Sequence, residues 1–253
     1  MSSSLRDKVI KNTFYHFAAQ AFGFLSPFIL TPLIIMYIGQ TEFGIYAIVL
    51  GFIGTFGLLD FSFSASFIKF ISEHYNRGNH DELNKTINTG LFFYIAFTLL
   101  ICIVVILFSE SILRLINIPP DLFELARFSL YISLVIFFTA TSSTIFVSVL
   151  ISIQKMYLNS IIGLVINILN FIITYILLVS GYGLKGILYS QLGAVAVSVF
   201  FNIILALKEV PAIKISPAYV NRQTLRQMGK FGLQMQVSRF SAFLSEKYDE
   251  FLL

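Results

Sequence analysis

The sequence has few charged residues. Asp, Glu, Lys and Arg make up only 12% of its 253 residues, and 57% of the residues are hydrophobic. Soluble domains carry about 25% charged residues. Apolar stretches of about 20 residues recur along the chain, and each can cross the roughly 30 Å hydrocarbon layer of a bilayer as a helix. The scarcity of charge therefore excludes a soluble domain and predicts an all-α, polytopic transmembrane helix bundle.

Cysteine and catalytic signatures are also scarce. The single cysteine, Cys102, excludes an intramolecular disulfide and a cysteine cluster for a metal. The sequence contains no HExxH, no glycine-rich phosphate loop and no acidic pair spaced to hold a metal-bound sugar nucleotide. We therefore expect no catalytic residues, no cofactor and no metal centre, and the protein is not expected to be an enzyme.

One loop leaves two interpretations open. His74 and His80 flank the stretch "SEHYNRGNHDELNK", close to three acids, and could hold a metal. The alternative is a solvated loop, which this polar composition favours. The three acids are Glu73, Asp81 and Glu82.

The apolar stretches predict six spans and the start of a seventh. The chain then divides into an N-terminal six-helix lobe at 1–207, a basic linker at 208–230 and the first span of a second lobe at 231–253. The six spans of the lobe are placed at 13–37, 43–70, 87–108, 125–148, 158–179 and 186–207.

Lysine and arginine concentrate on one side of these spans. Positive charge is retained on the cytoplasmic side of a membrane, so the asymmetry predicts a cytoplasmic N-terminus. The net charge of +4 then reflects contact with anionic lipid headgroups and no nucleic-acid partner. The predicted cytoplasmic segments hold Arg6, Lys8, Lys11, Lys69, Arg77, Lys85, Lys155, Lys208, Lys214, Arg222, Arg226 and Lys230, and the external loops hold Arg114, Arg127 and Lys185.

Polar residues recur at helical spacing in three spans. A helix surrounded by lipid has no use for a polar stripe. Small and amide residues also join helices by close packing and hydrogen bonds, so a single stripe fits either role, whereas stripes on three helices favour a shared wet cavity. The stripes are His16, Gln20, Gly23, Pro27 and Thr31 in the first span, Asn159, Gly163, Asn167, Asn170 and Thr174 in the fifth, and Gln191, Ser198 and Asn202 in the sixth.

The stretch "LLDFSFSASFIKF" carries a lone acid, Asp60, in the second span. An ionised carboxylate facing lipid there would cost roughly 3 kcal/mol or more, so we expect it to face the interior, to be partnered or to be protonated. Two roles remain open. Asp60 either couples or gates a transport cycle as a cavity acid, or it is a structural acid that caps a neighbouring helix or pairs with a cation such as Lys69.

Two long stretches carry a family resemblance. The first contains Pro32, the turn "YIGQTEFGIY" and the run "GLLDFSFSASFIKFISE", and the second is "SIQKMYLNSIIGLVINILNFIITYILLVSGYGLKGILYSQL". Together they resemble the bacterial polysaccharide-biosynthesis flippases, the O-antigen and related repeat-unit translocases of the multidrug/oligosaccharidyl-lipid/polysaccharide exporter superfamily. The likeness covers nearly the whole chain through diffuse patterns, so it indicates a family more than a substrate.

The resemblance implies two six-helix lobes around a central cavity that opens alternately to either side of the bacterial cytoplasmic membrane. Its implied partners are an undecaprenyl-diphosphate-linked oligosaccharide, membrane lipids and a coupling proton or cation. Since one lobe and the start of the next are present, we expect an N-terminal fragment. The alternatives are a cation-coupled multidrug exporter of the same superfamily and a membrane-embedded polysaccharide polymerase or transferase.

The seventh span adds two candidate residues. Arg239 suits a diphosphate at a cavity wall, although pairing with Glu246 on the same face is the alternative. "SEKYDEFLL" resembles the family's seventh-span stretch around an acid, which here is Asp249. The polar positions Gln234, Ser238, Ser241, Ser245 and Asp249 repeat the spacing of the first span, as expected of a transporter built from two like halves.

Overall fold

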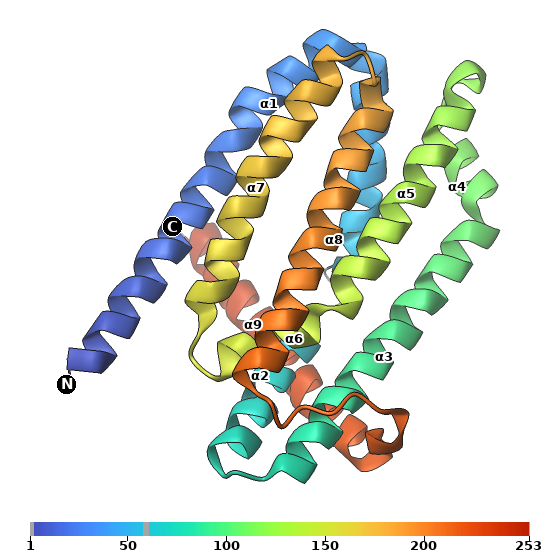
Figure 1. The fold of residues 1–253 in the computed structure, drawn as a ribbon. Coiled ribbons are helices and arrows are strands. Elements are labelled where there is room, and N and C mark those ends of the chain that lie inside the picture. The colour runs from blue at the N-terminus through green and yellow to red at the C-terminus, as the bar shows by residue number, and fades with distance from the viewer. Residues whose placement is uncertain (1–2, 58–60, 253) are drawn as a thin grey trace.

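A computed structural model describes residues 3–57 and 61–252, with side-chain surroundings for residues 13–56 and 63–237. The described residues form helices and no strands (Figure 1), which confirms the all-α prediction. The helices are α1 (Ser3–Gly57), α2 (Phe61–Asn76), α3 (His80–Leu107), α4 (Ser109–Leu115), α5 (Phe123–Ser142), α6 (Thr144–Ser152), α7 (Met156–Val179), α8 (Gly183–Glu209) and α9 (Arg222–Leu252), with short 3-10 turns at Pro120–Leu122 and Pro217–Tyr219.

Helix α1 holds the first predicted span and the first part of the second. Its apolar part, Thr13–Phe56, is 44 residues long, which at 1.5 Å per residue is about twice the hydrocarbon thickness. The chain folds back at Gly39 (Figure 1), whose φ of 78° and ψ of 166° lie outside the helical region and favour a residue without a Cβ. Five described helices, α1 among them, are long and apolar enough to cross a bilayer, and the fold at Gly39 divides the apolar part of α1 into two arms.

One predicted span contains a break that the sequence analysis missed. The second span, at 43–70, covers the end of α1, described to Gly57, and the start of α2, described from Phe61. The fourth span, at 125–148, breaks at Ser143, between α5 and α6. There the Ser143 hydroxyl donates to the Ala140 carbonyl at 2.8 Å. The hydroxyl thus satisfies a carbonyl that the end of a helix leaves unpaired.

The bundle has two ends (Figure 1), and each end has its own apolar core. The linker end contains the α2–α3 turn at Gly78, the α6–α7 turn at Gln154 and the linker segment 210–221, and the far end contains the turns at Gly39, Asn117 and Gly181. The linker-end core is centred on Phe67, Ile87, Tyr94, Ile145, Val149 and Met228. The far-end core is centred on Ile45, Val49, Leu113, Leu130, Leu184 and Ile187.

The basic residues that the sequence assigned to opposite sides of the membrane lie at opposite ends of the bundle. The described basic residues of the predicted cytoplasmic segments belong to the linker end, where Lys155 also pairs with Glu209 between α7 and α8. Arg114 and Arg127 belong to the far end and pair with nearby acids, Glu110 and Glu124. The basic segments therefore share one end of the bundle, as a single membrane face requires.

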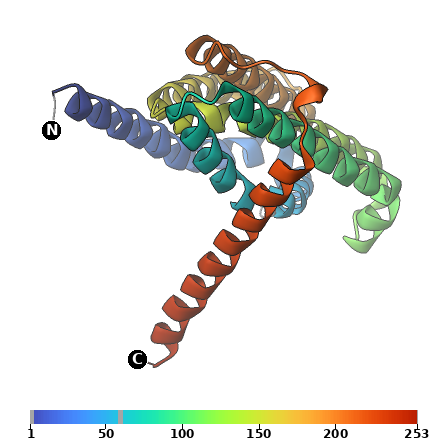
Figure 2. The ribbon, with the colours of Figure 1, turned by 90° about the horizontal axis from the view of Figure 1, so that it is seen from below.

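Helix α9 begins at Arg222, inside the segment predicted as a linker, and packs its first turns against α2 and α3. Beyond these turns it projects away from the bundle (Figure 2). The irregular connection is thus shorter than predicted, since α8 ends at Glu209 and α9 starts at Arg222.

Candidate functional site: an amide-lined groove

A groove of about 260 Å³ lies between α7 and α8, and Ile136 of α5 forms part of its wall. Its polar lining comes from four residues that the sequence pattern had grouped into stripes. They are Asn167 and Asn170 on α7 and Gln191 and Ser198 on α8. Positions three residues apart on one helix, or seven apart, lie on the same face, so each helix presents its pair to the groove.

A tight turn holds α7 and α8 side by side. Gly181 and Gly183 have φ values of 81° and 56°, in the left-handed region that glycine adopts most readily. A Cβ at Gly186 would lie 2.8 Å from the Tyr182 Cβ and 3.0 Å from the Leu177 Cβ. The two helices leave the turn at this close approach and run as an antiparallel pair (Figure 1).

Hydrogen bonds orient part of the polar lining. The Gln191 amide Nε2 donates to the Tyr46 hydroxyl of α1. The Asn170 Oδ1 accepts from the Ser190 hydroxyl at 2.7 Å, and the Thr174 hydroxyl donates to the same Ser190 oxygen at 3.0 Å. The described part of the chain shows no hydrogen-bond partner for the exposed Asn167 side chain. The amide of Asn167 is therefore free to bind a ligand.

Two further hollows adjoin this groove. One of about 240 Å³ shares Ile166, Asn170 and Ala194 with it and is otherwise mostly apolar. Another of about 200 Å³ shares Ile136 and lies between α1 and α5. It is also lined by Ser133, whose buried hydroxyl has no hydrogen-bond partner in the described chain. The lining of the three hollows is mostly apolar and contains scattered uncharged hydrogen-bond donors and acceptors.

Other predicted stripe residues lie elsewhere. His16 and Gln20 are exposed on the first half of α1, with their Nε2 atoms 3.4 Å apart, and they are not part of the groove lining. Asn159 is half-buried near the start of α7. Asn202 is buried, and its Nδ2 donates to the Ser198 carbonyl of its own helix at 2.9 Å.

The predicted charged candidates lie beyond what the structure describes. Asp60 falls between the two described ranges, and Arg239 and Asp249 lie on α9 where side-chain surroundings are not described. Their roles stay predictions.

The acids beside His74 and His80 are engaged in ion pairs. Glu73 binds Arg77 at 3.0 Å. Asp81 and Glu82 bind Lys85 at 2.7 and 2.8 Å. His74 stacks on the Phe70 ring. Among the described residues there is no group of three metal-ligating side chains, and these contacts fit a charged, solvated turn.

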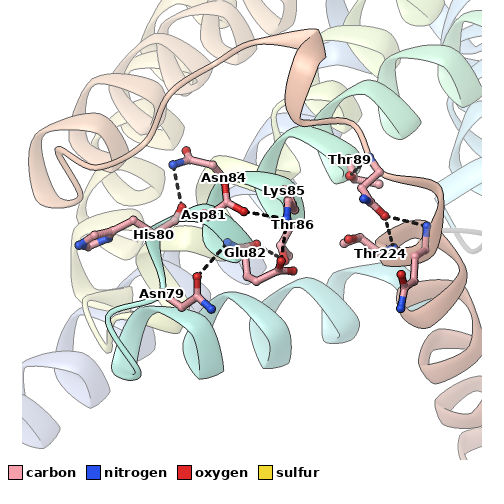
Figure 3. Close-up of polar contacts among 11 residues, drawn as sticks. Asn79, His80, Asp81, Glu82, Asn84, Lys85, Thr86, Thr89 and Thr224 are labelled. Carbon is pink, nitrogen blue, oxygen red and sulfur yellow. Dashed lines mark hydrogen bonds and ion pairs between the residues drawn. The ribbon is translucent and has the colours of Figure 1, made fainter.

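Three polar residues on α3 were overlooked in the sequence analysis. Asn84, Asn88 and Thr89 are buried and contact the backbone of the linker. Figure 3 shows Asn84 among the polar residues at the start of α3, and Thr89 beside the start of α9. A signal was present in "NKTINTG", where polar residues recur one helical turn apart immediately after a solvated loop.

The arrangement of helices is similar to that in about half of two solved multi-pass membrane proteins. An outward-facing multidrug resistance MATE family transporter of the MOP superfamily matches 95% of this chain with a TM-score of 0.74 and 14% identity. The Vibrio cholerae MATE transporter VcmN in its bent form matches 97% of the chain with a TM-score of 0.67 and 16% identity. The matches cover 54% and 58% of those two proteins, so this chain spans little more than half their length.

The sequence itself identifies the family. Residues 9–253 match the family described as polysaccharide biosynthesis protein, and the chain belongs to this family. The resemblance read from the first two spans and the fifth is thereby confirmed. None of the curated proteins with which the sequence was compared matches it.

Proposed function

We propose that this chain forms one lobe of a lipid-linked oligosaccharide flippase, which moves undecaprenyl-diphosphate-linked repeat units outward across the bacterial cytoplasmic membrane for surface polysaccharide synthesis. The family match over residues 9–253 is the observation that carries the proposal. Alternating access in transporters of two like halves comes from rocking one half against the other, so we expect transport to need a second lobe.

The chemistry of the groove supports a sugar ligand. Asn167, Asn170 and Gln191 offer amide groups that both donate and accept hydrogen bonds, which suits the hydroxyl groups of an oligosaccharide. The described lining contains no fixed charge, so a neutral sugar meets no unpaired ion. We propose His16, Gln20, Asn159 and Asn202 as further polar positions of the same lobe, and Asp60, Arg239 and Asp249 as the groups that meet a diphosphate or a coupling ion.

A cation-coupled multidrug exporter is the second candidate, and the fold shared with MATE transporters favours it. A polymerase or transferase has less support. It would need reactive groups on an external segment, and the 109–122 segment consists of α4 and a single 3-10 turn.

We expect Asn167→Leu to slow oligosaccharide transfer about tenfold while the protein keeps its normal abundance, since one lost hydrogen bond to a ligand costs on the order of 1.4 kcal/mol. The measurement uses the protein in the full length that its gene encodes, reconstituted in vesicles with a fluorescent undecaprenyl-diphosphate-linked sugar. Transfer is followed by protection from an impermeant quencher.

Val165→Leu is the matched control, because Val165 is exposed on the same helix and is not part of the groove lining. If Asn167→Leu and Val165→Leu transfer the sugar equally fast, the groove is not part of the substrate path. Efflux of a cationic dye without any transfer of the sugar would favour the multidrug exporter.

We also propose that the linker end faces the cytoplasm. A cysteine at Lys185, at the far end, is expected to react with an impermeant thiol reagent in intact cells, whereas one at Lys208, which is exposed at the linker end, is expected to react only after lysis. The native Cys102 is buried and contributes little background. Labelling of Lys208→Cys in intact cells would show that the linker end faces outward, which contradicts the proposed orientation.

A further inference from the structure

The linker backbone is bound by side chains of α3. The Lys214 N–H donates to the Asn84 Oδ1 at 2.7 Å, and the Ser216 N–H donates to the Asn88 Oδ1 at 2.8 Å. In return, the Asn84 Nδ2 donates to the Ala212 carbonyl at 3.0 Å, and the Asn88 Nδ2 donates to the Lys214 carbonyl at 2.7 Å. Each asparagine thus makes a reciprocal pair of bonds with the linker.

The two asparagine side chains bind the linker backbone in the way that a neighbouring β-strand would. Alternate linker residues, 212, 214 and 216, direct their backbone groups to α3. Two residues along a strand advance about 6.6 Å, and four residues along a helix advance about 6.0 Å. Asparagines one turn apart on a helix therefore match the repeat of an extended segment. Pro211 and Pro217, which lack an N–H, fall in the opposite register.

Both amides are held rigidly by their own helix. The Asn84 Nδ2 also donates to the His80 carbonyl, and the Asn88 Nδ2 to the Asn84 carbonyl, each at 2.8 Å. The two side chains are 3% and 0% exposed. Detaching the linker would take from the Oδ1 atoms of both asparagines the linker N–H groups that donate to them, and leaving such buried acceptors unpaired is costly.

The same surface fixes the start of α9. The Thr89 hydroxyl oxygen accepts from the Asn221 N–H at 3.0 Å. The Asn221 Oδ1 in turn accepts from the Gln223 and Thr224 N–H groups at 2.8 and 3.1 Å, which makes Asn221 the N-cap of α9. The cap is thereby tied to α3, and Figure 3 places Thr89 close to Thr224.

The first turns of α9 are held by α2 as well. The Ser66 hydroxyl donates to the Met228 carbonyl at 3.0 Å, and Met228 is buried. The Lys69 Nζ lies 4.0 Å from the centre of the Phe231 ring, a favourable cation–π distance. Beyond these contacts the rest of α9 projects away from the bundle (Figure 2). Phe231 is followed by Gly232, which is buried, and glycine weakens a helix interior.

We propose that Asn84, Asn88 and Thr89 are positioning residues that fasten the linker and the first turns of α9 to the first lobe. The fastened part, residues 212–231, moves with α3 in any conformational change, and α9 bends beyond Phe231. The linker is therefore an extension of the first lobe and not a flexible tether. This holds whichever substrate the protein carries.

Hydrogen exchange tests the fastening. In the intact protein, the linker amides of Lys214, Ser216 and Asn221 are expected to be protected. In Asn84→Leu/Asn88→Leu, the amides of Lys214 and Ser216 are expected to exchange about tenfold faster or more, because side chains of similar size no longer accept their hydrogen bonds. Thr98→Val is the matched control, since the buried Thr98 hydroxyl donates only within α3, to the Tyr94 carbonyl at 2.6 Å.

Spin labels locate the bend. With Cys102→Ser as background, a label at Tyr75 is paired with one at Gln223 or with one at Val237, all exposed positions. The distance from 75 to 223 is expected to stay narrow and constant, and the distance from 75 to 237 to broaden or shift. Unprotected linker amides in the intact protein, or a 75–223 distance as variable as the 75–237 distance, would overturn the proposal.

Discussion

Gly90→Val is expected to remove most of the folded protein from the membrane. A Cβ at Gly90 would lie 2.6 Å from the Phe67 Cε1 and 3.0 Å from the Ile145 Cδ1, closer than carbon atoms approach. Phe67 and Ile145 are fully buried, and the Phe67 ring packs edge-on against Tyr94, so neither side chain has space to move away. Overpacking of this kind costs about 1–3 kcal/mol for small insertions, and a whole isopropyl group adds more.

The measurement is the abundance and thermal midpoint of the purified variant. Gly51→Val is the control, because a Cβ at Gly51 meets no described atom within 4 Å and valine has the better helix propensity. In the double variant Phe67→Ala/Gly90→Val the neighbouring ring is removed, so part of the lost abundance and thermal midpoint is expected to recover. A midpoint for Gly90→Val equal to that of the wild type would contradict the close approach of α2, α3 and α6.

Gln191→Leu is expected to abolish most oligosaccharide transfer, about ten- to a hundredfold, because it removes an amide from the groove. It also leaves the hydroxyl of Tyr46, a residue that is 9% exposed, without its described donor. Loss of activity could then follow from a weakened contact between α1 and α8. A second variant, Tyr46→Phe, separates the two effects.

Tyr46→Phe is expected to lower stability by about 1 kcal/mol and to leave transfer near normal. The double variant Tyr46→Phe/Gln191→Leu removes both partners, and its stability is expected to recover relative to Gln191→Leu alone. Transfer by the double variant is expected to remain low. If transfer recovers together with stability, Gln191 acts only by joining α1 to α8, and the groove loses one of its proposed ligand contacts.

The amide face of the groove could be predicted because its residues repeat with the helical period. Asn167 and Asn170 lie three residues apart, and Gln191 and Ser198 seven, so their shared faces follow from helix geometry alone. The first-span stripe obeys the same rule, yet His16 and Gln20 lie outside the groove. Which face of α1 meets α7 is decided by contacts such as Phe22 against Phe171, and no periodicity within one helix contains that information.

The break in the fourth predicted span was hidden for a related reason. Hydropathy averaged over a window reports how apolar a stretch is, and the stretches on both sides of Ser143 are mostly apolar. The break at Ser143 interrupts the helix without changing the composition of the stretch. Hydropathy therefore merged α5 and α6 into one predicted span.

The sequence by itself determined the all-helical, multi-pass class, the family and the concentration of basic residues in alternate loops, because burial in lipid and charge retention act on local composition. The tertiary structure alone decided which polar residues meet. Asn88 binds Lys214 and Thr89 binds Asn221 across 126 and 132 residues of chain. Such contacts depend on how the helices pack, since a buried amide selects whichever backbone groups the fold brings within hydrogen-bond distance.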